Sequence, residues 1–134
     1  MSAQENLKLV RQGYEHFKSA NIQALLGLFS EDIQWELPQM QNVPFSGKRR
    51  GREQVGQFFA SLSKEQEVVQ FEPREFIADD EQVMVLGHYS WRVKSTGQKF
   101  ESDWAHVFTV RGGRIVRFRE YTDTAAATAA YRKS

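Results

Sequence analysis

Residues 100–121 read FESDWAHVFTVRGGRIVRFREY, the pattern of two β-strands joined at a pair of glycines. Apolar and polar residues alternate on both sides of Gly112 and Gly113, as they do in strands that bury one face. The same alternation begins near residue 66 and predicts four strands, over 67–78, 82–94, 98–110 and 114–122. The second half of the chain therefore forms an antiparallel meander.

The first half of the chain instead carries apolar residues at steps of three and four, the spacing of amphipathic helices. Ser2 and Glu5 form a capping box that starts a first helix. Asn21 caps a second helix, which reaches Phe29, and a third helix covers residues 55–62. Helices followed by a meander predict an α+β protein, with the helices gathered on one face of a curved sheet.

Shorter segments connect and end these elements. Residues 33–37 alternate apolar and polar side chains and predict a strand that stops at Pro38. Residues 38–52 contain two prolines and two glycines and predict a long loop. After the last strand, Asp123 suits the N-cap of an alanine-rich segment, residues 125–130, which is either a short terminal helix or a frayed tail.

Length and composition narrow the class of protein. The chain has 134 residues, 40% of them hydrophobic, which predicts one domain over residues 1–134 with a core of its own. Its 18 lysines and arginines against 17 aspartates and glutamates give a net charge of +1, without the basic surplus of a nucleic-acid-binding domain. It has no cysteine and no apolar run long enough to cross a membrane. We therefore expect a cytoplasmic protein with no disulfide, no nucleic-acid partner and no membrane contact.

The register of the last hairpin determines which side chains face the helices. If residues 111–113 form a three-residue turn with a bulge, His106 and Glu120 fall on the mainly apolar inner face, at diagonal positions on neighbouring strands. A two-residue turn would instead bring Arg117 and Arg119 inward, and burying unpaired guanidinium groups is costly. We therefore expect the bulged register, with side-chain atoms of His106 and Glu120 within about 6 Å of each other.

An ionisable pair on an apolar face has two interpretations, and both stay open here. Burial disfavours the charged form of each group, which would adapt His106 and Glu120 to acid–base chemistry. The same pair would also serve as a structural tether in which each side chain satisfies the other. Tyr14, on the apolar face of the first helix, is either a hydrogen-bond donor in a pocket or a core tyrosine.

Other kinds of site have weaker signals. Lys48, Arg49, Arg50 and Arg52 form a basic cluster, which is either a solvated loop or a binding site for an anion. The three histidines have none of the spacings of a metal site, so we expect no metal. The sequence also lacks nucleotide-binding and nucleophile motifs, and we expect no cofactor.

Several motifs resemble those of the SnoaL-like group in the nuclear transport factor 2-like (NTF2-like) superfamily. They are Phe29-Ser-Glu-Asp32, Pro44-Phe-Ser-Gly47, Arg50-Gly-Arg-Glu53, Gly113-Arg-Ile-Val116 and Arg119-Glu-Tyr-Thr-Asp123. The resemblance implies a cone in which three helices pack on a strongly bent, mixed but mainly antiparallel sheet around an apolar pocket. It also implies a homodimer through the outer sheet face, where Met84, Leu86, Val107 and Tyr121 place apolar surface that needs a cover.

The enzymes of this superfamily suggest roles for individual residues. Compared with ketosteroid isomerases, Tyr14 matches the oxyanion-hole tyrosine and His106 lies near the second oxyanion donor, but Leu37 stands at the position of the base and cannot accept a proton. Compared with epoxide hydrolases, Glu120 matches one acid, whereas Gly87 stands where the arginine belongs. The polyketide cyclases are more similar, because they carry a histidine and an aspartate at the positions of His106 and Glu120.

The resulting hypothesis is a cofactor-independent isomerase or cyclase that transfers a proton on a small apolar cyclic or polyketide-like molecule. His106 would be the general acid and base, Glu120 would orient it or share its proton, and Tyr14 would donate a hydrogen bond to a substrate carbonyl oxygen. The residues expected to bind the substrate are Trp35, Leu37, Phe58, Tyr89, Trp104 and Phe118, with Phe59 and Phe108 in the same core. The alternative is a non-catalytic ligand-binding or dimerisation domain of the same fold.

Overall fold

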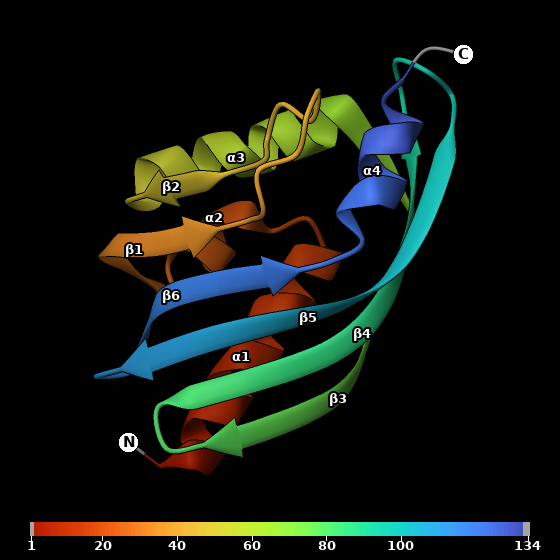
Figure 1. Ribbon diagram of the computed structural model, residues 1–134. Coiled ribbons are helices and arrows are strands. Elements are labelled where there is room, and N and C mark those ends of the chain that lie inside the picture. The colour runs from red at the N-terminus through yellow and green to blue at the C-terminus, as the bar shows by residue number, and fades with distance from the viewer. Residues whose placement is uncertain (1, 133–134) are drawn as a thin grey trace.

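The computed structural model describes residues 2–132, in which helices pack on one curved six-stranded sheet (Figure 1). The elements follow the chain in the order α1 (Ala3–Lys18), α2 (Ile22–Leu26), β1 (Phe29–Glu36), β2 (Lys48–Arg50), α3 (Arg52–Glu65), β3 (Gln66–Asp79), β4 (Gln82–Val93), β5 (Lys99–Arg111), β6 (Arg114–Tyr121) and α4 (Thr124–Ala130). The strand order across the sheet is β2-β1-β6-β5-β4-β3. All neighbours are antiparallel except β1 and β6, which run parallel. The α+β class and the mixed, mainly antiparallel sheet are therefore confirmed.

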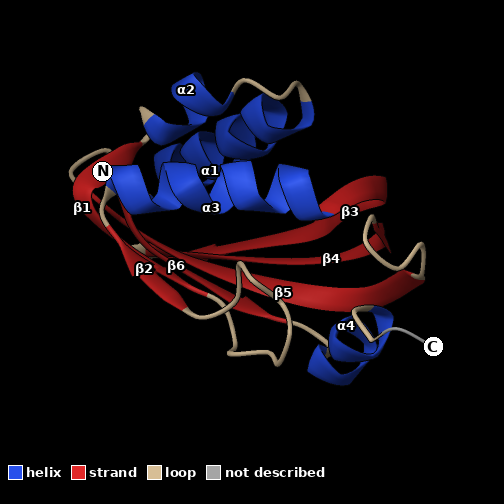
Figure 2. Ribbon diagram, turned by 90° about the horizontal axis from the view of Figure 1, so that it is seen from above, coloured by secondary structure: helices blue, strands red, loops and turns tan. Residues whose placement is uncertain are grey.

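The helices α1, α2 and α3 cover one face of the sheet (Figure 2). Ser2 and Glu5 form the predicted capping box at the start of α1, and the Asn21 side chain caps α2. The prediction for α2 is wrong at its end, because Gly27 terminates the helix and Phe29 already lies in β1. Phe29 continues the apolar spacing of α2, but its side chain is buried as part of β1.

The segment 38–52, predicted as a loop, contains β2, which pairs antiparallel with β1. Three consecutive basic residues show no apolar–polar alternation, so the sequence carries no strand signal here. Arg49 Nη1 donates a hydrogen bond of 2.7 Å to the backbone oxygen of Phe45, and Arg52 Nε donates one of 2.9 Å to that of Phe29. Two arginines of the basic cluster thus hold the backbone around β2.

The β5–β6 hairpin has a tighter turn than predicted. Arg111 pairs with Arg114 around a two-residue turn, and both turn residues have positive φ, 56° at Gly112 and 77° at Gly113. Two consecutive residues with positive φ match the twist of a two-residue hairpin, and glycine adopts that conformation without strain. The predicted three-residue turn is therefore wrong.

A bulge one step further along the hairpin restores the predicted faces. Val110 pairs with Ile115, but Thr109 pairs with Arg117, which leaves Val116 as the extra residue in β6. An extra residue reverses the alternation that follows it. Glu120 therefore faces inward, as predicted, while Arg117 and its neighbours of the same parity face outward.

One apolar cluster fills the space between the helices and the sheet. It includes all six aromatic residues expected from α3 and the strands: Trp35, Phe58, Phe59, Trp104, Phe108 and Phe118. Trp35 and Phe118 are partners on the parallel strands β1 and β6, and their rings stack with centroids 3.9 Å apart. The parallel pairing thus joins the first strand to the meander through its core face.

The alanine-rich segment is a helix, α4. The Asp123 side chain caps it and accepts a hydrogen bond of 3.0 Å from the N–H of Ala126. Ala127 and Tyr131 are buried in the same core as the other helices. Figure 1 places α4 just past the end of β6, and Figure 2 shows it apart from α1, α2 and α3. None of the helices within residues 2–132 is long and apolar enough to span a membrane.

Candidate functional site

Three side chains from three elements form a hydrogen-bonded chain on the inner face of the sheet. His106 of β5 and Glu120 of β6 lie directly opposite each other, and His106 Nε2 is 2.9 Å from Glu120 Oε1. His106 Nδ1 is 2.7 Å from the hydroxyl oxygen of Tyr14 on α1. The predicted proximity of His106 and Glu120 is confirmed, at opposite instead of diagonal positions.

The chemistry of these groups assigns the protons along the chain. An ionised carboxylate only accepts hydrogen bonds, so Nε2 of His106 carries a hydrogen and donates it to Glu120. In a neutral ring Nδ1 is then the acceptor, and the hydroxyl of Tyr14 donates to it. Burial lowers the pKa of His106, and the charge of Glu120 opposes that shift. Burial raises the pKa of Tyr14 well above its ordinary value, and the charge of Glu120 adds a smaller shift in the same direction.

Glu120 is the member of the chain with an unoccupied polar atom. Both ring nitrogens of His106 already have partners, and the hydroxyl hydrogen of Tyr14 is used. Within residues 2–132 only Oε1 of Glu120 has a hydrogen-bond partner, which leaves Oε2 free. Oε2 of Glu120 is therefore the side-chain polar atom of this chain that remains available to a bound molecule.

A cavity of about 90 Å³ lies next to the chain, between the helices and the inner face of the sheet. Tyr14, His106 and Glu120 all line it. Five of the predicted substrate-binding residues also line it, namely Trp35, Leu37, Phe58, Tyr89 and Phe118. Trp104 does not, because its indole stacks on the His106 ring at a centroid distance of 3.9 Å. Trp104 therefore supports His106 and lies behind it.

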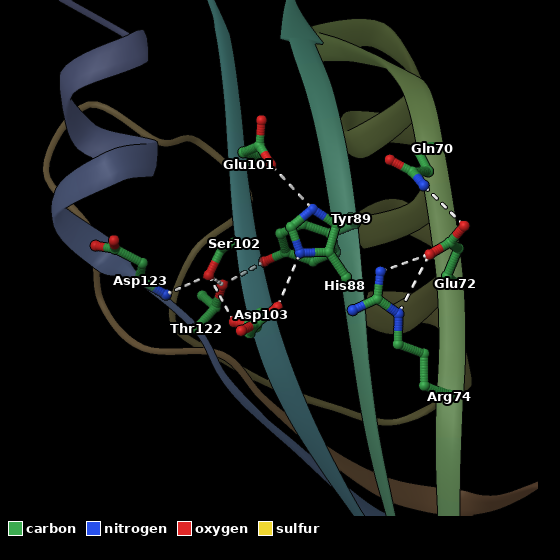
Figure 3. Close-up of polar contacts among 10 residues, drawn as sticks. All are labelled: Gln70, Glu72, Arg74, His88, Tyr89, Glu101, Ser102, Asp103, Thr122 and Asp123. Atoms are coloured by element: carbon green, nitrogen blue, oxygen red, sulfur yellow. Dashed lines mark hydrogen bonds and ion pairs between the residues drawn. The ribbon is translucent and has the colours of Figure 1, made fainter.

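A second hydrogen-bonded chain runs from the cavity to the end of β6 (Figure 3). The hydroxyl oxygen of Tyr89 is 2.6 Å from Thr122 Oγ1, and Thr122 donates to Ser102 Oγ at 3.1 Å. Ser102 in turn donates to the backbone oxygen of Asp103 and accepts from the N–H of Asp123. Burial and the charge of Glu120 raise the pKa of Tyr89, so its phenol stays protonated. Because each hydroxyl donates to the next, this chain offers no free donor to the cavity.

The opposite face of the sheet carries a separate group of charges (Figure 3). His88 lies between two acids of β5, with Nδ1 2.9 Å from Asp103 and Nε2 3.1 Å from Glu101. On β3, a hydrogen bond from Arg74 lowers the pKa of Glu72. Among the residues that the structure describes, no three His, Asp or Glu side chains are arranged to hold a metal ion.

Comparison with known proteins identifies the family. Residues 10–118 match the family described as the SnoaL-like domain. The chain belongs to this family. An NTF2-like protein from Burkholderia xenovorans LB400 is 35% identical to it, with a TM-score of 0.89 over 98% of this chain and 99% of that chain. An NTF2-like protein of unknown function from Burkholderia pseudomallei K96243 is 27% identical, with a TM-score of 0.87 over 98% of each chain.

More distant relatives have the same fold. TerC, solved after co-crystallization with polyporic acid, is 24% identical, with a TM-score of 0.82 over 95% of this chain and 98% of that chain. No curated protein matches the sequence significantly. The predicted SnoaL-like membership and the NTF2-like fold are therefore confirmed.

The cavity of this SnoaL-like domain includes two polar residues that sequence analysis missed. Gln66 lines it, although it belongs to the polar run of residues 64–67, which gives no sign of burial. Thr122 also lines it. A signal for Thr122 was present, because it follows Glu120 by two residues and therefore shares its side of the chain.

Proposed function

We propose that this SnoaL-like domain binds a small, largely apolar molecule in the cavity and that Glu120 accepts a proton from it. The observation that supports this is the free Oε2 of Glu120 at the edge of an apolar cavity, with Oε1 anchored by His106. A fixed carboxylate next to the reacting atom is the arrangement that general-base catalysis requires. No cofactor is needed, because the proton that Glu120 removes is returned to the same molecule.

The proposal changes the roles expected from the sequence. His106 is a positioning residue, because its two nitrogens already bind Glu120 and Tyr14. Tyr14 is a positioning residue too, since its hydroxyl holds the tautomer of His106 that donates to Glu120. In the reaction, Glu120 Oε2 takes a proton from the carbon that lies between a carbonyl group and a carbon–carbon double bond. It returns the proton to the far carbon of that double bond, so that the double bond moves next to the carbonyl group and the molecule isomerises.

A non-catalytic binding domain is the second candidate, and a specific observation favours it. A substrate oxygen that gains negative charge needs a hydrogen-bond donor. Tyr14 donates to His106 and Tyr89 donates toward Thr122, so neither of the two phenols that line the cavity is free to supply it. A binding protein needs Glu120 only as an acceptor for a hydroxyl or amine of its ligand.

Hydrogen exchange of a cyclic ketone separates these functions. The carbon between the ketone and the ring of 2-tetralone has acidic hydrogens, whose exchange in D2O is followed by proton NMR. We expect the wild-type protein to accelerate this exchange and Glu120→Gln to leave only the uncatalysed rate, because glutamine accepts a hydrogen bond but no proton. Asp123→Asn changes a nearby acid outside the cavity and serves as the control.

The outcomes distinguish the candidates. Binding of 2-tetralone without faster exchange identifies a binding domain. Exchange that is accelerated equally by wild type and Glu120→Gln contradicts the assigned role of Glu120.

A further inference from the structure

The cavity has a further polar residue, Gln66, toward the end opposite His106. Gln66 pairs with Val93 of β4, whereas His106 pairs with Val85 of the same strand. Eight residues of extended strand span up to about 26 Å, and bending of the sheet shortens this distance. Gln66 and the chain of His106 and Glu120 thus line different parts of one cavity.

A hydrogen bond fixes the orientation of the Gln66 amide. Gln66 is only 4% exposed, and its Oε1 accepts a hydrogen bond of 2.7 Å from the hydroxyl of Tyr131, which is also buried. Burial raises the pKa of Tyr131, so the phenol keeps the hydrogen that it donates. Nε2 of Gln66 has no hydrogen-bond partner in the described part of the chain. Nε2 is not one of the fully buried polar atoms that lack a partner, so it keeps accessible surface on a residue that lines the cavity. An acceptor on a bound molecule would give it a hydrogen bond there.

The charge of the cavity limits what it can bind. Its lining includes the polar side chains of Tyr14, Gln66, Tyr89, His106, Glu120 and Thr122 and the indoles of Trp35 and Trp91, but no lysine or arginine of residues 2–132. An anionic ligand would lose its hydration without gaining a cation, and it would be repelled by Glu120.

We propose that Gln66 is a second ligand-binding residue of this cavity, and that the ligand is elongated and not anionic. One end of the ligand presents to Glu120 the hydrogen that Oε2 accepts, on an acidic carbon or on a hydroxyl group, and the other end carries an acceptor, such as a ketone, for Nε2 of Gln66. Tyr131 is the positioning residue for Gln66. This inference rests on the proposed binding at Glu120 and adds the polarity of the ligand at both of its ends.

Matched pairs of phenols test the proposal. Each pair has a hydroxyl group for Glu120 and, at the far end, either an acetyl group or an ethyl group. The pairs are built on three scaffolds of increasing length. They are 4-acetylphenol and 4-ethylphenol, 6-acetyl-2-naphthol and 6-ethyl-2-naphthol, and 4-acetyl-4′-hydroxybiphenyl and 4-ethyl-4′-hydroxybiphenyl. We expect the acetyl member to bind about 3- to 10-fold more tightly on at least one scaffold, the effect of one uncharged hydrogen bond. Calorimetric titration measures these affinities, and circular dichroism verifies that each variant is folded.

The variants separate this inference from the proposed function. Gln66→Leu should abolish the preference for acetyl over ethyl, with Gln66→Met as a second variant of similar volume, and Tyr131→Phe should reduce it. Glu120→Gln should weaken both members of a pair equally and leave the preference unchanged. On the naphthalene scaffold, 6-hydroxy-2-naphthoic acid should bind more weakly than 6-acetyl-2-naphthol because it is an anion.

Two results would overturn the inference. One is the absence of an acetyl preference on all three scaffolds, and the other is a preference that persists in folded Gln66→Leu or Gln66→Met. Failure of the ethyl compounds to bind the wild-type protein would instead contradict the proposed function, on which this inference depends.

Discussion

His106 Nε2 and Glu120 Oε1 are 2.9 Å apart because the two residues lie directly opposite each other on β5 and β6. The turn between their strands alone would not bring them together. The extra residue Val116 turns Glu120 to the inner face. Glu120 there binds Nε2 of His106, so Nδ1 is the ring nitrogen that accepts a hydrogen bond from Tyr14. A single bulge therefore determines the polar chain at the cavity.

Removal of the Tyr14 hydroxyl should weaken this chain without emptying the core. In Tyr14→Phe the aromatic ring stays, but Nδ1 of buried His106 loses its donor. We expect the free energy of unfolding to fall by about 1–2 kcal/mol, the cost of an unpaired buried polar group. Denaturation in urea measures this change. Tyr121→Phe, at an exposed tyrosine, is the matched control, and equal effects of the two substitutions would contradict the role of Tyr14.

The stability of the protein should depend on pH through His106. Burial lowers the pKa of His106 in the folded protein, whereas in the unfolded chain it titrates near 6.5. Just below pH 6.5 His106 therefore binds a proton in the unfolded chain but not in the folded protein. The neutral His106 contributes fully to the free energy of unfolding above that pH, and this contribution is lost as the pH falls. We expect the free energy of unfolding to decrease from about pH 7 to about pH 5 more steeply in wild type than in His106→Gln. Parallel pH profiles of the two proteins would refute this explanation.

Truncation of Trp104 should destabilise the fold strongly. The side chain is 3% exposed and stacks on both His106 and Phe71, with centroid distances of 3.9 and 5.4 Å. A large buried aromatic residue replaced by alanine costs roughly 3–5 kcal/mol. Thermal unfolding should show a much lower melting temperature for Trp104→Ala, and Trp104→Phe should recover part of the loss. An unchanged melting temperature would contradict the inward orientation of this strand face.

Because Gly87 has no side chain, the Trp104 indole can lie directly against it. A Cβ atom at Gly87 would lie 2.5 Å from the backbone oxygen of Glu72 and within 2.3 Å of the Trp104 ring. Because neither the backbone nor the packed indole can yield freely, we expect Gly87→Ala to lower the free energy of unfolding by about 1–3 kcal/mol.

A second glycine provides the control for Gly87. At Gly56, in the middle of α3, an added Cβ would make an ordinary contact of 3.5 Å with Leu26. Gly56→Ala should therefore be neutral or stabilising by up to about 1 kcal/mol, since alanine favours helix. Equal chemical-denaturation midpoints for the two variants would show that the close approach at Gly87 is unimportant.

The outer face of the sheet should form a homodimer. Ile77 and Met84 are paired on β3 and β4, and they are 53% and 40% exposed. Tyr121, also on this face, is 53% exposed, and apolar surface of this kind is stabilised when a second copy covers it. We expect light scattering to show a dimer at about 10 µM and Met84→Lys to shift it toward monomer. Gln12→Lys, at an exposed position of α1, is the control, and a wild-type monomer at this concentration would contradict the prediction.

Helices, strands and the faces of the meander were predictable because their signals are local. The capping box of Ser2 and Glu5, the Asp123 cap and the alternation around Gly112 and Gly113 involve residues a few positions apart. Burial then selects the face, since the wrong parity would place arginines in the core. The resemblance added that the sheet is mixed, and the structure shows that β1 and β6 are the parallel pair.

The roles of the site residues depend on contacts between distant segments. Tyr14 and His106 are separated by 92 residues, and Gln66 and Tyr131 by 65. No period or motif in the sequence relates such pairs, because their distance depends on how the helices sit on the bent sheet. The tertiary structure alone shows that both nitrogens of His106 are occupied, that Oε2 of Glu120 has no partner within residues 2–132, and that a glutamine in a polar run lines the cavity.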